Sequence, residues 1–309
     1  MLQLLNKAYT ITSNIDVFEG NKLNLFLAEK NDKLAKLGLY FDLRPGWKIY
    51  WVHPGESGLP PQITIKNKKI YESLNINWPI PEELYEKDIN LSTRVYKGKI
   101  IIPIDLYLGK NKLINNKLRF NIDYQICKDI CIPIEANLVI KIPDTNYFNK
   151  KNIDLLKEYK DKVPKEISIY KKYTLNYIKY NKNIINVSIS KSFNLNLKNN
   201  EDLRLFLHGE NFPTFRMKNK IIKDKELIFE LIANEPIQDY EKKITAFFLV
   251  DNDAFYIKTN IVSDNDILNT KKIFFLIIIS FAAGFILNFM PCVLPVIGIK
   301  ITNFLKQIE

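Results

Sequence analysis

Two of the three cysteines in this chain stand four positions apart, in the segment YQICKDICIPIEA at residues 124–136. Such a pair can staple the fold as a disulfide, contribute ligands to a metal site, or exchange electrons with another protein. The chain has only two histidines, His53 and His208, which are far apart in the sequence. With so few cysteines and histidines, a closed four-ligand zinc site is nearly impossible to assemble, so we expect neither a metal nor a cofactor.

The residues around the cysteine pair alternate between apolar and polar types. The apolar set comprises Leu118, Phe120, Ile122, Tyr124 and Ile126 before the pair, and Ile132, Ile134, Ala136, Leu138 and Ile140 after it. This period of two predicts two strands joined by a three-residue hairpin loop at 128–130. Cys127 and Cys131 would then lie opposite one another at the strand ends. Their α-carbons would be about 4.5–5.5 Å apart, which suits a disulfide.

The same alternation places both cysteines on the polar face of the hairpin, together with Gln125 and Glu135. We therefore expect an accessible disulfide, whereas structural cystines are usually buried. Because the bridge closes a very short loop, the chain-entropy argument gives it less stabilising power than a long-range bridge. These features favour a redox-active pair over a structural staple and over a metal site. Lys128 favours a thiolate and Asp129 opposes it, and the sequence gives a slight preference to Cys131 as the attacking thiol.

The third cysteine, Cys292, lies in an apolar segment near the end of the sequence. The run from Ile273 to Ile299 has no charged residue and exceeds the roughly 20 residues that cross a bilayer. We therefore expect a transmembrane helix here. Pro291 and Pro295 bracket Cys292 and break the helix. Since irregular backbone at membrane depth must be buried in protein or line a cavity, we expect Cys292 inside a larger bundle. The alternative is a chance cysteine in an apolar run.

Most of the preceding sequence has the alternation and the turn formers of β-structure. The segment KIIIPIDLYL at residues 99–108 places Ile100, Ile102, Ile104, Leu106 and Leu108 on one face of a strand, and RPGW at 44–47 and HPGESGLPP at 53–61 have turn composition. Many short strands separated by such turn segments indicate an antiparallel sandwich from about Ala8 to Pro143. His53 stands in one of these turns, and we expect it to be solvated and without a catalytic role.

A second strand-rich block follows a linker with a short helix. The linker, residues 144–165, contains NIDLLKEYKDKVPK, with Asn152 or Asp154 as the expected cap and Pro164 as the terminator. The expected strands of the second block are LRLFLHG (203–209), ELIFELIA (226–233), ITAFFLV (244–250) and AFYIKTNIV (254–262). We expect this block to be a second sandwich that spaces the first from the membrane.

The predicted fold is therefore mainly β, with two antiparallel β-sandwiches followed by a transmembrane helix. The predicted domains are residues 1–145, which carry the cysteine pair, residues 146–268 with the leading linker helix, and residues 269–309 with the membrane helix. The chain has 309 residues, which is more than a single hydrophobic core usually supports.

Several function classes find no support in the sequence. The formal charge is +11, from 45 Lys and Arg against 34 Asp and Glu, but the lysines are scattered and form no long basic run. We therefore expect no nucleic-acid binding. The sequence has no G-x-S-x-G, H-E-x-x-H or G-x-G-x-x-G motif, so hydrolase and dinucleotide-enzyme functions are not indicated.

Three motifs together resemble the DsbD family of thiol:disulfide interchange proteins, and within it the suppressor-of-copper-sensitivity type, ScsB. They are LRPGWKIYWVHPGESGLPPQ at 43–62, YQICKDICIPIEA at 124–136 and GFILNFMPCVLPVIGIKI at 284–301. The resemblance implies an immunoglobulin-like periplasmic domain with a reactive pair, here Cys127 and Cys131. It also implies a membrane domain whose first helix carries a proline-flanked cysteine, here Cys292.

The resemblance implies a protein-disulfide reductase that passes reducing equivalents across the bacterial inner membrane to periplasmic disulfide proteins, including cytochrome c maturation partners. The implied electron donor is a thioredoxin-like domain or protein. The stretch MLQLLNKAYTITSN lacks the apolar run of a secretory signal, and no further membrane helix or thioredoxin-like domain follows. We therefore expect the front portion of such a protein.

Two other functions remain open at this point. One is a non-enzymatic, membrane-tethered β-sandwich that binds partners and uses Cys127–Cys131 as a staple. The other is Cu(I) handling by the two thiolates, although no Met-rich or His-rich stretch assists it.

Overall fold

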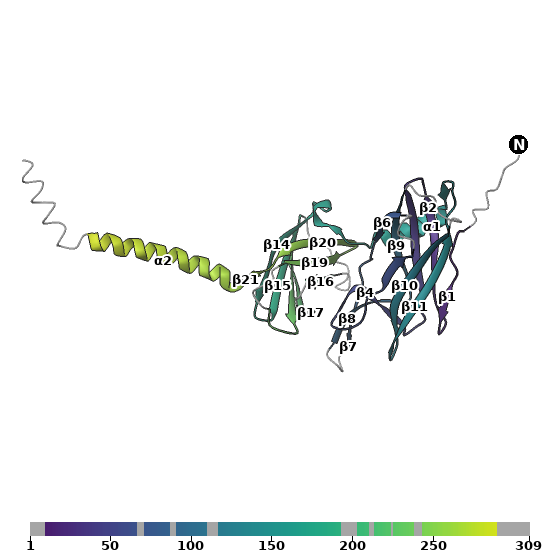
Figure 1. Ribbon diagram of the computed structural model, residues 1–309. Coiled ribbons are helices and arrows are strands. Elements are labelled where there is room, and N and C mark those ends of the chain that lie inside the picture. Colours follow the sequence, from purple (N-terminus) through teal and green to yellow (C-terminus); the bar gives the residue numbers. More distant parts are fainter. Residues whose placement is uncertain are drawn as a thin grey trace, which may run out of the picture.

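The computed structural model describes residues 10–66, 71–86, 91–109, 117–192, 203–209, 213–223, 225–237 and 243–288. Most of these residues form β-strands, and the last described element is one long helix (Figure 1). Cys292 and the proline-flanked part of the apolar segment lie outside the described residues. The prediction of a mainly β fold is confirmed.

Two antiparallel sheets form what we name the N-terminal unit, residues 10–160. The first sheet consists, in spatial order, of β1 (Asp16–Phe18), β2 (Asn21–Lys30), β3 (Leu34–Asp42), β9 (Lys99–Leu108) and β6 (Tyr71–Ile76), with β12 (Tyr147–Phe148) paired to β2. The second consists of β11 (Cys131–Lys141), β10 (Lys117–Cys127), β4 (Lys48–Gly55), β8 (Leu91–Lys97) and β7 (Glu82–Glu86), with β5 (Gln62–Ile65) paired to β10. Cys127 thus ends one strand and Cys131 begins the next.

The core of this unit lies between the two sheets. Leu39 and Ile104 from the first sheet and Ile122 and Leu138 from the second are all fully buried in it. The predicted apolar face of β10 is buried along its whole length, and Ile122 pairs with Ala136 of β11 in the predicted register. A fully buried aliphatic side chain stabilises the fold by about 1.5–3 kcal/mol, so this face fixes which side chains of the hairpin point outward.

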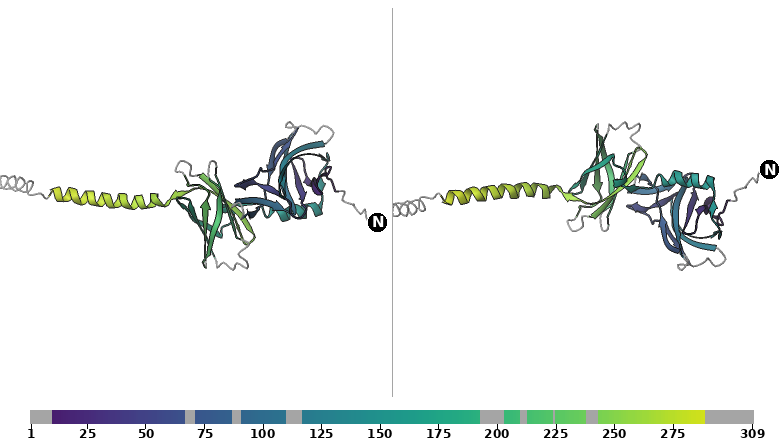
Figure 2. Two further views of the ribbon diagram at one scale, coloured as in Figure 1. Left: turned by 90° about the horizontal axis from the view of Figure 1, so that it is seen from below. Right: turned by 90° about the horizontal axis from the view of Figure 1, so that it is seen from above.

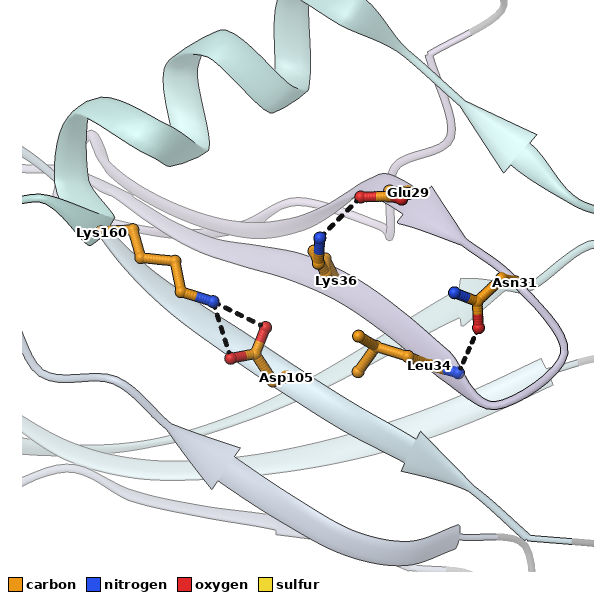
Figure 3. A network of polar contacts seen from close by, with 6 residues as sticks. All are labelled: Glu29, Asn31, Leu34, Lys36, Asp105 and Lys160. Atoms are coloured by element: carbon orange, nitrogen blue, oxygen red, sulfur yellow. Dashed lines mark hydrogen bonds and ion pairs between the residues drawn. The ribbon is translucent and has the colours of Figure 1, made fainter.

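Helix α1 (Lys150–Lys160) packs on the outside of the first sheet and is not a free linker. Its N-cap is Asn149, whose side chain accepts a hydrogen bond from the backbone N–H of Asn152. The predicted caps Asn152 and Asp154 are therefore wrong, because Asn152 is buried and donates instead to the carbonyl of Leu27 at 2.8 Å. Near the other end of the helix, Lys160 forms an ion pair with Asp105 of β9 at 2.9 Å (Figure 3).

Two further sheets form what we name the C-terminal unit, residues 165–263. One consists of β13 (Lys165–Glu166), β20 (Asp253–Asn260), β19 (Lys243–Val250) and β16 (Arg204–His208). The other consists of β17 (Phe215–Ile222), β18 (Glu226–Ala233), β15 (Ile184–Lys191), β14 (Tyr173–Asn181) and β21 (Val262–Ser263), and a short 3-10 helix spans Ile167–Ile169. The four strands expected from the sequence in this block are present as β16, β18, β19 and β20. The unit has a hydrophobic core of its own.

Helix α2 (Asp264–Asn288) follows the C-terminal unit and projects away from both units (Figure 2). Within the part of the chain that the structure describes, no helix has both the length and the hydropathy that crossing a membrane requires. The transmembrane helix predicted within 269–309 is therefore not found there.

Candidate functional site

Cys127 and Cys131 form a disulfide at the tip of the β10–β11 hairpin. The two residues are register partners, and their α-carbons are 4.1 Å apart. The predicted pairing is thus confirmed, at a separation slightly shorter than expected. The loop between the cysteines is closed by a hydrogen bond of 3.1 Å from the Lys128 N–H to the Ile130 carbonyl.

The two cysteines differ in their exposure to solvent. Cys131 is exposed, whereas Cys127 is 1% exposed and packs with Tyr50, Val95 and Leu84. The prediction that both cysteines are accessible is therefore wrong for Cys127. The alternation within β10 places Cys127 on the outer face, but the neighbouring strands β4 and β8 bring Tyr50 and Val95 over that face.

Tyr50 contacts the other half of the disulfide. Its hydroxyl lies 3.4 Å from Cys131 Sγ, and since a disulfide sulfur carries no proton, the phenol is the donor. Burial raises the pKa of Tyr50, the charge of Lys48 opposes that change, and Glu86 adds to it. The phenol is therefore protonated at neutral pH and remains a donor when the disulfide is reduced.

Lys48 places a positive charge at the same strand end. It is the register partner of Cys127 on β4 and forms an ion pair with Glu86 at 2.6 Å. Because Glu86 neutralises this charge, the Tyr50 hydroxyl is the more direct stabiliser of a thiolate on Cys131.

The turn segment 56–61 lies against Tyr50. Gly58 has φ +104°, and a β-carbon at this position would lie 2.4 Å from the Tyr50 ring. Only glycine combines this backbone conformation with so close an approach. The next residue, Leu59, donates its N–H to Gln125 Oε1 at 3.0 Å, which ties the segment to the outer face of β10.

A groove of about 320 Å³ lies beside this segment, on the outer face of the hairpin. It is lined by Leu59 and Pro60 on one side and by Gln125, Pro133 and Glu135 on the other. Gln125 and Pro133 are each two residues from a cysteine of the pair, so the groove lies close to the disulfide.

His53 is not the solvated turn residue that the sequence indicated. It belongs to β4, and its ring stacks on that of His208 with centroids 3.6 Å apart. Burial lowers the pKa of His53 to about 4, and the neighbouring charges of His208 and Arg94 act in the same direction. His53 is therefore neutral at pH 7. Sequence reasoning missed this pair because the two residues are 155 positions apart and the sequence carries no signal of their contact.

The remaining site predictions concern Cys292 and metal ligands. Cys292 lies outside the described residues, so its role stays a prediction. Among the residues that the structure describes, no group of three or more His, Cys, Asp or Glu side chains is arranged to hold a metal ion.

Comparisons with known proteins agree with this geometry. Residues 22–143 match the family model of thiol:disulfide interchange protein DsbD, N-terminal. The crystal structure of the N-terminal periplasmic domain of ScsB from Proteus mirabilis is similar in fold, with a TM-score of 0.68 and 15% identity, covering 82% of this chain and 99% of that chain. No curated relative matches the sequence.

A second solved structure is the Neisseria meningitidis DsbD N-terminal domain in the reduced form. It has 13% identity and covers 47% of this chain and 94% of that chain, but its TM-score of 0.26 is too low to support a fold assignment. The immunoglobulin-like fold of the N-terminal unit thus rests on the family model and on the ScsB likeness. Residues 22–143 therefore match the N-terminal domain family of thiol:disulfide interchange protein DsbD, and the fold of the chain is similar to that of the N-terminal periplasmic domain of ScsB.

Proposed function

We propose that Cys127–Cys131 is a redox-active disulfide through which this protein reduces disulfides of other proteins. The observation that supports this function is the asymmetry of the pair, an exposed Cys131 bonded to a buried Cys127 across a three-residue loop. Exchange requires that a thiolate approach one sulfur while the other leaves, and of the two cysteines Cys131 is the exposed residue.

The reaction takes place in two exchanges. A thiolate of a thioredoxin-like donor attacks Cys131 Sγ, the bond to Cys127 breaks, and Cys127 leaves as a thiolate that takes up a proton. The second thiol of the donor then attacks the mixed disulfide and releases Cys131, so that two electrons have entered the pair and the donor is oxidised. In the second exchange, the Cys131 thiolate attacks a substrate disulfide, and Cys127 resolves the resulting mixed disulfide.

Tyr50 has a role in the second exchange. Because its hydroxyl lies 3.4 Å from Cys131 Sγ, it donates a hydrogen bond to the thiolate and lowers the pKa of that thiol. A larger thiolate fraction at neutral pH makes Cys131 the attacking residue, in line with the slight preference from the sequence. Cys127, buried and without that donor, is the resolving residue.

The setting and partners follow from the family and are part of the proposal. A disulfide that cycles through exchange belongs in an oxidising compartment, and the similar ScsB domain is described as periplasmic. We place both units in the periplasm, with a thioredoxin-like donor and periplasmic disulfide proteins, including cytochrome c maturation partners, as acceptors. We further propose membrane attachment through the uncharged run 273–299, with Cys292 as a thiol of a membrane relay.

Trapping of mixed disulfides tests the central claim. Cys127→Ser leaves Cys131 as a single thiol, which should attack the disulfide of an oxidised thioredoxin-like protein, or of a substrate, and remain bound to it as a mixed disulfide. Cys131→Ser is the matched control, because its remaining thiol is buried, and it should trap little. Equal adduct from both variants would refute the assigned roles.

A redox titration separates this function from the alternative, a binding module with a structural staple. A structural disulfide typically has a reduction potential below about −300 mV, whereas relay disulfides are more oxidising. We expect a potential above that limit, together with reduction of the folded protein by thioredoxin. A potential below it would assign the pair to the staple.

A further inference from the structure

Strand β4 contacts the disulfide with one face and the C-terminal unit with the other. On one face, the Tyr50 hydroxyl reaches Cys131 Sγ at 3.4 Å. On the other, the Trp51 ring packs on Phe247 of β19 and Phe206 of β16, with centroid distances of 5.1 and 6.0 Å. Two successive residues of one strand thus connect the redox site to the C-terminal unit.

Strand β8, the neighbour of β4, repeats this arrangement. Val95 packs on Cys127 with Tyr50, while the preceding residue, Arg94, points to the C-terminal unit. One guanidinium nitrogen of Arg94 donates to the carbonyl of His53 on β4 at 3.3 Å, and another donates to the carbonyl of Leu207 on β16 at 3.2 Å. A single side chain therefore joins both strands of the redox site to the other unit.

Arg94 is buried in this position, with 4% of its surface exposed. Its guanidinium carbon lies 5.2 Å from the centre of the Phe206 ring, which adds a cation–π contact. Burial lowers the pKa of Arg94 to about 10, and the carboxylates of Glu83 and Glu56 oppose the change, so the group is charged at neutral pH. A buried cation is costly unless it is bonded, so this one favours the arrangement in which both carbonyls stay in place.

The aromatic residues of the C-terminal unit complete the contact. Phe206 is 1% exposed and belongs to the hydrophobic core of the N-terminal unit, although β16 is a strand of the other unit. Arg204 of the same strand donates to the carbonyl of Pro81 at 2.9 Å. The two units therefore share packed side chains and do not merely follow one another along the chain.

We propose that Arg94 is a positioning residue for the thiol–disulfide reaction. By binding one carbonyl on β4 and one on β16, it fixes the β4–β8 pair against the C-terminal unit and holds Tyr50 in hydrogen-bond range of Cys131. The C-terminal unit then sets the reactivity of Cys131 and is more than a spacer. This inference rests on the proposed function only in taking Cys131 as the reacting thiol.

The test measures the apparent thiol pKa of Cys131 in the full chain. The protein is reduced, and the rate of alkylation by iodoacetamide is followed against pH. Arg94→Met keeps the length and the packing on Phe206 but loses both carbonyl contacts. We expect its Cys131 pKa to rise and its alkylation rate at neutral pH to fall about two- to tenfold, which corresponds to the lower part of the coupling range of contacting residues.

Two further variants make this result specific. Arg204→Met is the matched control, because it loses a hydrogen bond between the units that does not involve β4 or β8, and we expect no change in the thiol pKa. Phe206→Leu weakens the same contact as Arg94→Met from the other unit and should shift the thiol pKa in the same direction. If Arg94→Met does not fold, the thiol pKa of Phe206→Leu still tests the proposal.

A double-mutant cycle with Tyr50→Phe shows whether Arg94 acts through Tyr50. Once the hydroxyl is absent, Arg94→Met should have no further effect on the thiol pKa. Full additivity, an equal shift in Arg204→Met, or an unchanged pKa in folded Arg94→Met and Phe206→Leu would each overturn the proposal. Alkylation needs no redox partner, so a protein that fails to reduce any disulfide substrate would refute the proposed function and leave this result standing.

Discussion

The hydroxyl of Tyr50 lies 3.4 Å from Sγ of Cys131, although the two residues are 81 positions apart in the sequence. The contact exists because β4 pairs with the cysteine end of β10, where Ile49 and Lys48 are the partners of Ile126 and Cys127. The middle strand of this sheet thus also delivers a hydrogen-bond donor to the reactive sulfur. The first prediction concerns this donor.

Removing the Tyr50 hydroxyl should make the disulfide harder to reduce. In Tyr50→Phe the thiolate of the reduced form loses a hydrogen bond worth about 0.5–1.5 kcal/mol. That loss corresponds to a reduction potential about 10–30 mV more negative, which a titration against a glutathione or dithiothreitol couple measures. Tyr107→Phe, on β9 of the other sheet, is the control and should leave the potential unchanged. A potential that does not move in Tyr50→Phe would exclude the contact from the chemistry.

The disulfide itself should contribute little to stability. For a closed loop this short, the chain-entropy relation gives about 2 kcal/mol, against about 3 for a 15-residue loop. We expect the doubly substituted Cys127→Ser/Cys131→Ser protein to fold and to lose no more than about 2 kcal/mol in urea unfolding. A loss nearer 5 kcal/mol would identify a structural bridge instead.

Gly58 should control access to the disulfide. A methyl group at this position would clash with the Tyr50 ring, and φ +104° is a conformation that alanine rarely adopts. Gly58→Ala should therefore displace segment 56–61 and raise the rate at which dithiothreitol reduces the disulfide. Gly98→Ala is the matched control, since Gly98 also has a positive φ, +63°, but nothing lies within 4 Å of its added β-carbon. It should cost about 1–2 kcal/mol of stability and leave the rate of reduction unchanged, and equal rates in the two variants would contradict this role of Gly58.

The His53–His208 stack should make the protein acid-sensitive. Because the pKa of His53 falls from 6.5 to about 4 on folding, the unfolded chain binds a proton more readily between those values. The contribution of His53 to stability is therefore complete above about pH 6.5 and is lost as the pH falls towards 4. Urea midpoints measured against pH should converge for wild type and His53→Gln in that window, because Gln has no proton to gain. Parallel curves would show that His53 titrates normally.

The hairpin could be predicted from the sequence, and the burial of its cysteines could not. Alternation along β10 and β11 is a local signal, and it gave the register and the pairing of Cys127 with Cys131. What covers Cys127 comes from β4 and β8, through Tyr50 and Val95, and strand order in a sheet leaves no periodic trace in the sequence. The burial of Cys127 is therefore the part that the sequence mispredicts, because it depends on strands that are distant in the sequence.

The boundary between the units was hard to predict for a similar reason. The helix pattern near residue 150 was visible, but its cap at Asn149 and its buried Asn152 depend on the carbonyl of Leu27, a distant partner. The contacts of Arg94 with His53 and Leu207 join elements as far as 113 positions apart. A sequence pattern shows which face of a strand is apolar, but it does not show which other segment covers that face.

The packing of helix α1 sets how the molecule tumbles in solution. The family match ends at residue 143, yet α1 covers Phe26, Ala28 and Ile101 on the first sheet. A polypeptide cut after residue 143 would expose this surface to water, so the smallest intact N-terminal piece runs through Lys160. Only residues 161–164 then connect it to β13. Because this connection is so short, the two units should tumble together as one rigid particle. The exposed Cys131 would then reach its partners by diffusion of the whole molecule.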